Sequence, residues 1–424
     1  MIKPDKNKKH NLWIFYYIFL GIIQATWTSM TSQPPLPLRF LMLAAVFGPM
    51  LIRKEYIVFG IPFFMILRGQ LATDYQYMPD IRSFEFYIPL LLCLLFYHGK
   101  KINLNQFKWY IPLAAMIFYI CMVDIFAIGT IGIYGKNLLV AIIFSAFITS
   151  EDDSKILANA LMSVCALLAV YYLMMYDRFL DTWDTTHGIE RSGWNDPNYF
   201  STLLGIGFLI ALLQVFNHIK GKYVIFPKSV LILIAIIIYV SIVLTASRAG
   251  FIAATVTLIF TIIKSKVRFT TILVSIALIG VCIAIMAHKG VFDALLFRMV
   301  DQGGLDTGGG RTFIWTRTLQ NFETQPHINQ ILGGGYWHRA KLSGGADLHN
   351  ELFSVGADYG YLGFILFVGF IVSLLLKKDD KLTIKLLATT YYILAIMSLS
   401  PFQYINISFF LIWIISLKLS SSTK

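Results

Sequence analysis

His349 is the residue of this sequence best placed to move a proton. It stands directly before an apolar segment, in the string His349-Asn350-Glu351, and Asp358 follows within three helical turns. Histidine is the side chain most easily tuned to accept or donate a proton near neutral pH. Alone at a helix start, a histidine is usually a cap or an interfacial residue. The neighbouring carboxyl groups favour a catalytic His349, with Glu351 as a weaker candidate for the base or for fixing the histidine tautomer.

Two arginines lie beside predicted helix starts in other polar segments. Arg191 precedes a turn-forming string that opens into an apolar helix at Tyr199, and Arg248 sits in a hairpin between two apolar segments. The planar guanidinium group binds phosphate or carboxylate through two parallel hydrogen bonds, and helix N-termini accept anions readily. Both residues therefore predict an anion site. The alternatives are a loop with an ordinary helix cap for Arg191 and snorkelling to lipid headgroups for Arg248.

The long polar segment 288–350 carries further basic residues, among them Arg311 and Arg339. Residues 311–322 form an amphipathic pattern typical of a helix that lies in a membrane interface, where Trp315 and Phe322 would anchor it. We include Arg311 and Arg339 in the predicted anion site. A surface helix with snorkelling arginines is the alternative.

Composition limits the classes of protein that could hold these residues. Of 424 residues, 57% are hydrophobic and only 14% are charged, whereas soluble domains average about 25% charged residues. This excludes a water-soluble fold. The net charge of +12 does not indicate nucleic-acid binding, because the basic residues are scattered between apolar runs instead of gathering on one soluble face. The four cysteines all lie inside apolar runs, so we interpret them as packing residues, with no metal site.

The apolar runs predict an all-α polytopic transmembrane bundle of about 12 to 14 helices, because each is roughly long enough to cross a bilayer. We expect a single integral membrane domain over residues 1–424, with 288–350 as a long extracytoplasmic loop that contains short helices. The run at 55–67 is short and interrupted by Pro62, which favours partial insertion. The runs lie at about 12–28, 37–52, 55–67, 83–98, 109–128, 135–149, 156–176, 199–216, 229–246, 250–263, 270–287, 351–376, 384–399 and 403–418.

Orientation follows from the lysines, which gather in alternate short connections. Basic connections are retained on the cytoplasmic side. This pattern predicts that both termini are cytoplasmic. It also places the segments 177–198, 247–250 and 288–350 together on the external face. Most of the arginines that are not in lysine-rich connections lie in these three segments.

The string His349-Asn350, followed after nine residues by Gly360-x-x-Gly363, resembles the histidine signature of the O-antigen ligase and polymerase family of bacterial membrane glycosyltransferases. The resemblance covers residues 185–375. Three further strings are similar to landmarks of that family and occur in its order: Arg191 with Gly193 and Asp196-Pro197-Asn198, Ser247-Arg248-x-Gly250, and Arg311-x-x-x-Trp315.

This resemblance implies a reaction at the outer face of the bacterial cytoplasmic (inner) membrane, in surface-polysaccharide assembly. A glycan on undecaprenyl pyrophosphate would move, with inversion, to an acceptor hydroxyl, and the reaction would need no cofactor, metal or nucleotide sugar. The acceptor would be another glycan for a repeat-unit polymerase, which we favour, or lipid A core for a ligase. Arg191, Arg248, Arg311 and Arg339 would then bind pyrophosphate, and His349 would serve the acceptor hydroxyl.

A flippase or transporter of lipid-linked oligosaccharides is the alternative from a different class. Transporters place ionisable residues near the membrane midplane and show related halves. In this chain only Asp124 is expected inside the membrane, near an outer helix end, and no internal repeat is visible. The concentration of polar residues in the outer segments favours an enzyme.

Overall fold

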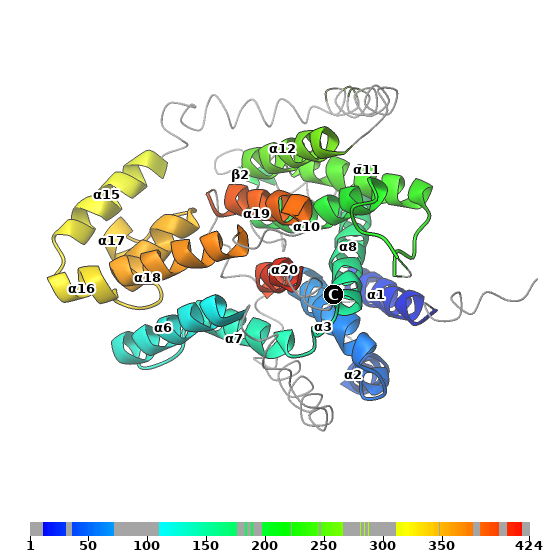
Figure 1. The fold of residues 1–424 in the computed structure, drawn as a ribbon, viewed down its shortest axis with the longest axis horizontal. Coiled ribbons are helices and arrows are strands. Elements are labelled where there is room, and N and C mark those ends of the chain that lie inside the picture. The colour runs from blue at the N-terminus through cyan, green and yellow to red at the C-terminus, as the bar shows by residue number, and fades with distance from the viewer. Residues whose placement is uncertain are drawn as a thin grey trace, which may run out of the picture. The chain divides into compact units, whose positions relative to one another are not determined.

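Helices make up nearly all the regular structure of the described residues (Figure 1). The one exception is a two-residue antiparallel pair, β1 (Trp183–Asp184) and β2 (Gly188–Ile189). The all-α prediction is confirmed. The structure, a computed structural model, describes residues 12–30, 36–71, 110–175, 183–184, 188–189, 197–221, 223–245, 247–265, 280, 284, 287, 311–346, 348–375, 382–397 and 405–417.

The chain divides into two compact units, and each is built from two separate stretches of sequence. The first unit comprises 1–104 and 144–241, and the second comprises 105–143 and 242–424. The expected single membrane domain therefore stays a prediction. The first unit holds α1 (Leu12–Met30), α2 (Leu36–Met50), α3 (Lys54–Leu71), α8 (Glu151–Met174), α10 (Pro197–Val215) and most of α11 (Lys228–Leu244). The second holds α6 (Ile111–Ile128), most of α7 (Ile133–Ser145), α12 (Arg248–Lys264), α15 (Arg311–Glu323), α16 (His327–Leu332), α17 (His338–Ser343), α18 (Glu351–Leu375), α19 (Leu382–Ile396) and α20 (Ile405–Ser416).

Several of these helices can cross a membrane. In the described part of the chain, four are long and apolar enough for a full span: Ile111–Ile128, Glu151–Met174, Asn198–Val215 and Glu351–Leu375. Shorter apolar helices accompany them, including Lys228–Leu244 and Leu382–Ile396. The total of about 12 to 14 membrane helices stays a prediction. The run at 83–98, and all but three residues of the run at 270–287, lie outside the described residues.

In the first unit, α8 packs against both α3 and α10. The middle of α8 is buried almost completely, because small residues such as Ala158 and Ala160 let its neighbours approach closely. Helix α3 continues through Pro62 from Lys54 to Leu71, longer than the expected run. Phe59 and Phe63 on α3 are fully buried and stack at 5.5 Å between ring centroids.

Polar contacts link the short connections between helices at one end of this unit. Asp153 accepts backbone hydrogen bonds from Thr149 and Ser150, and its Oδ2 lies 2.6 Å from Nζ of Lys54. The Ser150 hydroxyl accepts in return from the backbone of Asp153, which completes a capping box at the start of α8. Nearby on α8, Asn159 donates to the Tyr223 carbonyl. The start of α8 thus joins the connections before α3 and before α11.

We predict that Asp153→Ala lowers the stability of the detergent-solubilised protein by about 1–2 kcal/mol, because it removes the carboxylate half of the capping box and leaves Lys54 without its carboxylate. Thermal unfolding monitored by fluorescence measures this change. Asp152→Ala, which removes an exposed acid from the same turn, is the matched control. Equal melting temperatures for the two variants would contradict the prediction.

Candidate functional site

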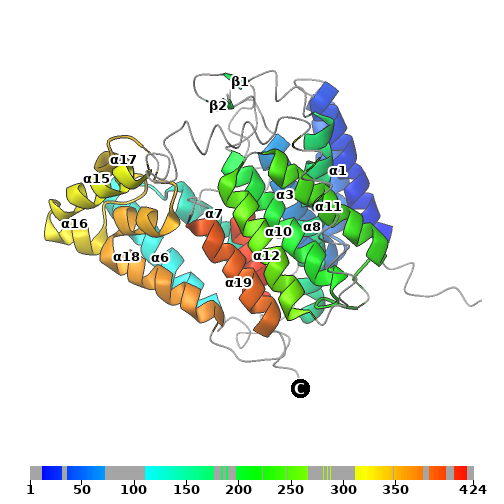
Figure 2. The same ribbon diagram turned by 90° about the horizontal axis from the view of Figure 1, so that it is seen from above.

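Residues 311–350, which we call the outer module, fold into three short helices that rest on the start of α18 (Figure 2). Their apolar core consists of Phe322, Leu342 and Leu348 together with Ala357 of α18. Ile314, Trp315 and Phe353 pack against this core. The outer module therefore has a defined shape of its own and is fixed to the end of a membrane helix.

Trp315 and Phe322 both make contacts within the protein. The indole N–H of Trp315 donates to the Leu348 carbonyl at 2.8 Å, and its ring stacks on Phe353 with centroids 5.1 Å apart. Phe322 lies in the module core and meets Tyr361 edge-on at 5.4 Å. The amphipathic pattern located the helix correctly, and Trp315 and Phe322 on its apolar face contact residues of α18; a position of this helix in the membrane interface stays a prediction. Phe313, 71% exposed, and Leu319, 46% exposed, are apolar side chains that α15 presents outward.

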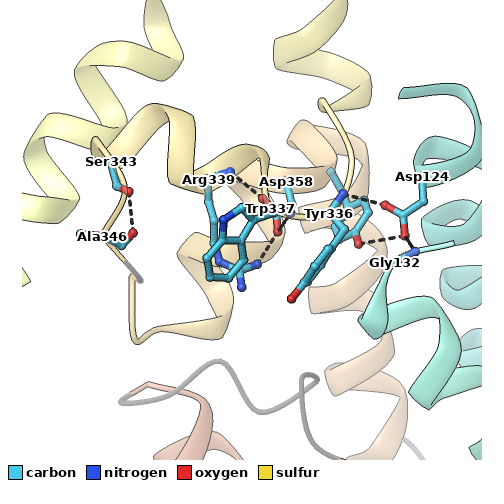
Figure 3. A network of polar contacts seen from close by, with 9 residues as sticks. Asp124, Gly132, Tyr336, Trp337, Arg339, Ser343, Ala346 and Asp358 are labelled. Carbon is cyan, nitrogen blue, oxygen red and sulfur yellow. Dashed lines mark hydrogen bonds and ion pairs between the residues drawn. The ribbon is translucent and has the colours of Figure 1, made fainter. Parts of the chain in front are cut away.

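Arg339 and Asp358 form an ion pair in which both side chains are fully buried (Figure 3). Asp358 also accepts the backbone N–H of Arg339 at 2.6 Å and that of Trp337 at 3.3 Å. Three aromatic rings surround the guanidinium group, with centroids at 5.2 Å for Tyr134, 5.5 Å for Tyr336 and 4.8 Å for Trp337. The charge of Arg339 is thus compensated inside the protein. This differs from the expected anion-facing side chain, so we leave Arg339 out of the site proposed below.

A break in α18, directly after Asp358 and Tyr359, brings the α18 backbone close to the outer module. Gly360 has a φ of +66°, and the Asp358 carbonyl accepts N–H groups from Gly334 and Gly335 at 3.0 and 2.9 Å. A Cβ atom on Gly360 would lie 2.5 Å from the Ile331 carbonyl oxygen. Glycine is required here for both its left-handed backbone and the close approach of two main chains. The first glycine of the histidine signature therefore has a structural role.

Asp124 connects a second helix to the same turn. It lies near the end of α6, fully buried, where it accepts the Gly132 N–H at 2.9 Å and the Tyr336 N–H at 2.7 Å (Figure 3). The Tyr359 hydroxyl lies 3.5 Å from the same carboxylate. The position near a helix end agrees with the sequence expectation. No sequence pattern indicates that Asp124 binds the turn after α16.

His349 lies between two residues that are held firmly. Leu348 is buried and accepts the Trp315 hydrogen bond, while Asn350 caps α18 by accepting the Phe353 N–H at 3.2 Å. Asn350 also donates from Nδ2 to the Met397 carbonyl at 3.1 Å, beyond the end of α19. His349 itself has a φ of +47°, in the left-handed region that residues other than glycine seldom occupy.

The imidazole ring of His349 is partly exposed, and its Nδ1 is buried without a hydrogen-bond partner among the residues that the structure describes. Glu351 follows as the first residue of α18 and is fully buried, close enough to Tyr392 of α19 to act on it electrostatically. A ring with an uncommitted nitrogen, held on a rigid turn, can accept a proton from a bound hydroxyl.

The other predicted arginines stand at helix starts. Arg248 is the first residue of α12, where the Ser247 hydroxyl accepts the Gly250 N–H at 3.2 Å, and the partly buried Arg311 is the first residue of α15. Free N–H groups at such positions attract anions. Arg191 and the side chain of Arg248 lie outside the described residues. That these arginines and His349 share one site stays a prediction.

We predict that Asp358→Asn destabilises the protein by about 3–5 kcal/mol, because it leaves a buried guanidinium group without its counter-charge. Thermal unfolding of the purified protein measures the loss. Glu323→Gln neutralises an exposed acid at the end of α15 and serves as the control. An Asp358→Asn protein as stable as this control would show that the ion pair is dispensable.

Comparison with known proteins supports the motif-based resemblance. No curated protein matches the chain. Residues 231–368 match the family model described as O-antigen ligase, a stretch that runs from α11 through α12 and the outer module into α18. It contains Arg248, Arg311, His349 and Glu351, together with the Arg339–Asp358 pair. Over residues 231–368 this multi-pass membrane protein is therefore similar to the O-antigen ligase family.

Proposed function

We propose that this protein is a membrane glycosyltransferase that moves a glycan from undecaprenyl pyrophosphate to an acceptor hydroxyl at the outer face of the cytoplasmic membrane. The observation that carries the proposal is the position of His349. It lies inside the family-matched segment, at the polar end of a candidate membrane helix, on a turn that is fixed from both sides.

Contacts within each unit support the proposed orientation. In the second unit, Asp124 joins the 129–132 connection to the outer module, and Asn350 reaches Met397. The lysine pattern assigns all of these segments to the external side. In the first unit, Lys54 forms an ion pair with Asp153. Asn159, in the first turns of α8, donates a hydrogen bond to the Tyr223 carbonyl. The same pattern assigns these positions to the cytoplasmic side. These contacts among the described residues each join segments of the same assignment, and this agreement favours cytoplasmic termini.

The packing of α12 favours an Arg248 close to His349. Helix α12 lies beside α19 (Figure 2), and Met397, just beyond the end of α19, accepts the hydrogen bond from Asn350. In the proposed topology α12 begins and α19 ends on the external side. Arg248 would then stand at the outer end of α19, next to the turn that holds His349.

The proposed reaction is a direct displacement. His349 takes the proton of the acceptor hydroxyl, whose oxygen attacks the anomeric carbon of the donor glycan. The bond from that carbon to the pyrophosphate oxygen breaks, and undecaprenyl pyrophosphate leaves with the electron pair. Arg191, Arg248 and Arg311 would stabilise the negative charge that develops on the leaving group. Glu351 would be a second candidate for the base or would orient the histidine.

We favour a repeat-unit polymerase, in which the acceptor is a second lipid-linked glycan, over a ligase that uses lipid A core. Reconstitution with a lipid-linked glycan as the only substrate tests this choice. A polymerase lengthens the glycan, whereas a ligase forms product only after lipid A core is added. A flippase would move the glycan across the vesicle membrane without forming any glycosidic bond.

We predict that Arg248→Ala lowers the rate of product formation by about 100- to 1,000-fold while the protein stays in the membrane at its normal level. Arg248→Lys should recover only part of the rate, because a lysine cannot form the paired hydrogen bonds of a guanidinium group. Gel analysis of glycan products from reconstituted vesicles measures both. Full activity of Arg248→Ala would refute its role at the pyrophosphate.

We predict that His349→Asn lowers the turnover rate by about 100- to 10,000-fold, the range for loss of a general base. Asparagine adopts the left-handed backbone more readily than most residues, so this variant removes the base and keeps the turn. His327→Asn, at an exposed histidine of α16, is the matched control. A His349→Asn enzyme with unchanged turnover would exclude His349 as the base.

A further inference from the structure

Two hydrogen bonds hold the residues on either side of His349. Before it, the Leu348 carbonyl accepts the indole N–H of Trp315 at 2.8 Å. After it, Asn350 donates to the Met397 carbonyl at 3.1 Å. One bond leads to the outer module and the other to the end of α19. His349 is therefore the residue at which two separate supports meet.

The conformation of His349 needs such support. Its φ of +47° is costly for a side chain that carries a Cβ atom, and residues keep this conformation only where their surroundings impose it. The φ angle also sets the direction of the Cα–Cβ bond. A change to the common extended or helical conformation would turn the imidazole ring away from its present place.

Trp315 is itself held rigidly, so it can impose this geometry. Its ring stacks on Phe353, with centroids 5.1 Å apart and an angle of 21° between the planes. Helix α15, which carries it, is bonded to α17 through Asn321, whose amide donates to the Leu342 carbonyl at 2.6 Å. The indole N–H of Trp315 therefore extends from a helix that is held in place, and it donates to the Leu348 carbonyl.

We infer that Trp315 is a positioning residue for His349: its hydrogen bond to the Leu348 carbonyl keeps the histidine in the left-handed conformation that aims the imidazole at the acceptor hydroxyl. The inference rests on the proposed role of His349 as the base. It assigns to the tryptophan a task that packing alone would not require, because a ring without an N–H donor could also stack on Phe353.

The substitution Trp315→Phe separates the two roles, since it keeps an aromatic ring for Phe353 to stack on and removes the N–H donor along with part of the ring volume. We expect kcat to fall about 10- to 100-fold, as for other small misplacements of a catalytic group, while KM for the acceptor stays within about twofold. Thermal stability and membrane level should match those of Phe313→Leu, a control at an exposed position of the same helix. A normal kcat, or a loss of activity that only follows a loss of folded protein, would overturn the inference.

A second measurement does not depend on activity. Diethyl pyrocarbonate modifies histidines, and peptide mass spectrometry reads each position separately. In Trp315→Phe, the modification rate of His349 should rise severalfold relative to that of the exposed His327, because the ring is released from its half-buried position. Equal relative rates in the wild type and the variant would contradict the inference.

The two proposals fail in different ways. If His349→Asn loses activity and Trp315→Phe keeps its full kcat, the positioning role is wrong and the catalytic role stands. If His349→Asn keeps full activity, the catalytic role is wrong, and the modification rates alone decide whether Trp315 fixes the conformation of His349.

Discussion

The carboxylate and the backbone carbonyl of Asp358 organise the second unit around the first turns of α18. Together they accept the side chain and N–H of Arg339 and the N–H groups of Trp337, Gly334 and Gly335. An aspartate and an arginine removed from water stabilise a fold only when their charges are paired. The resulting geometry is specific, because the turn after α16 can dock in only one register. The shape of the outer module, and with it the turn that carries His349, depends on this docking.

The arginine in this pair shows how one residue type serves two opposite purposes near a membrane. Arg339 is enclosed by aromatic rings and an aspartate, whereas Arg248 and Arg311 begin helices. A compensated charge inside the protein holds main chains together. A charge at a helix start adds to the field of the free N–H groups there. The first arrangement suits a scaffold, and the second suits a site that must receive and release an anion.

Much of the fold could be predicted from the sequence, because apolar runs and turn residues set helix positions locally. The predicted helix at 199–216 corresponds to α10 at Pro197–Val215, and the histidine signature does mark the start of α18. The environment of individual side chains could not be predicted. Nothing in the sequence distinguishes a buried Arg339 from an exposed one, since its partner is 19 positions away and the pairing depends on a tertiary turn. The periodicity of α15 likewise shows that Trp315 belongs to an apolar face, but a lipid surface and a protein core produce the same pattern.

The break at Gly360 also bears on the thickness of the surrounding bilayer. Below it, α18 runs from Tyr361 to Leu375, and Lys377 and Lys378 end the apolar sequence soon afterwards. At 1.5 Å per residue this straight portion is only about 22 Å long, shorter than the roughly 30 Å of a typical hydrocarbon core. Lipids beside this helix must therefore thin, or the break must lie below the headgroups. The depth of the turn before α18 is therefore tied to the thickness of the bilayer around this helix.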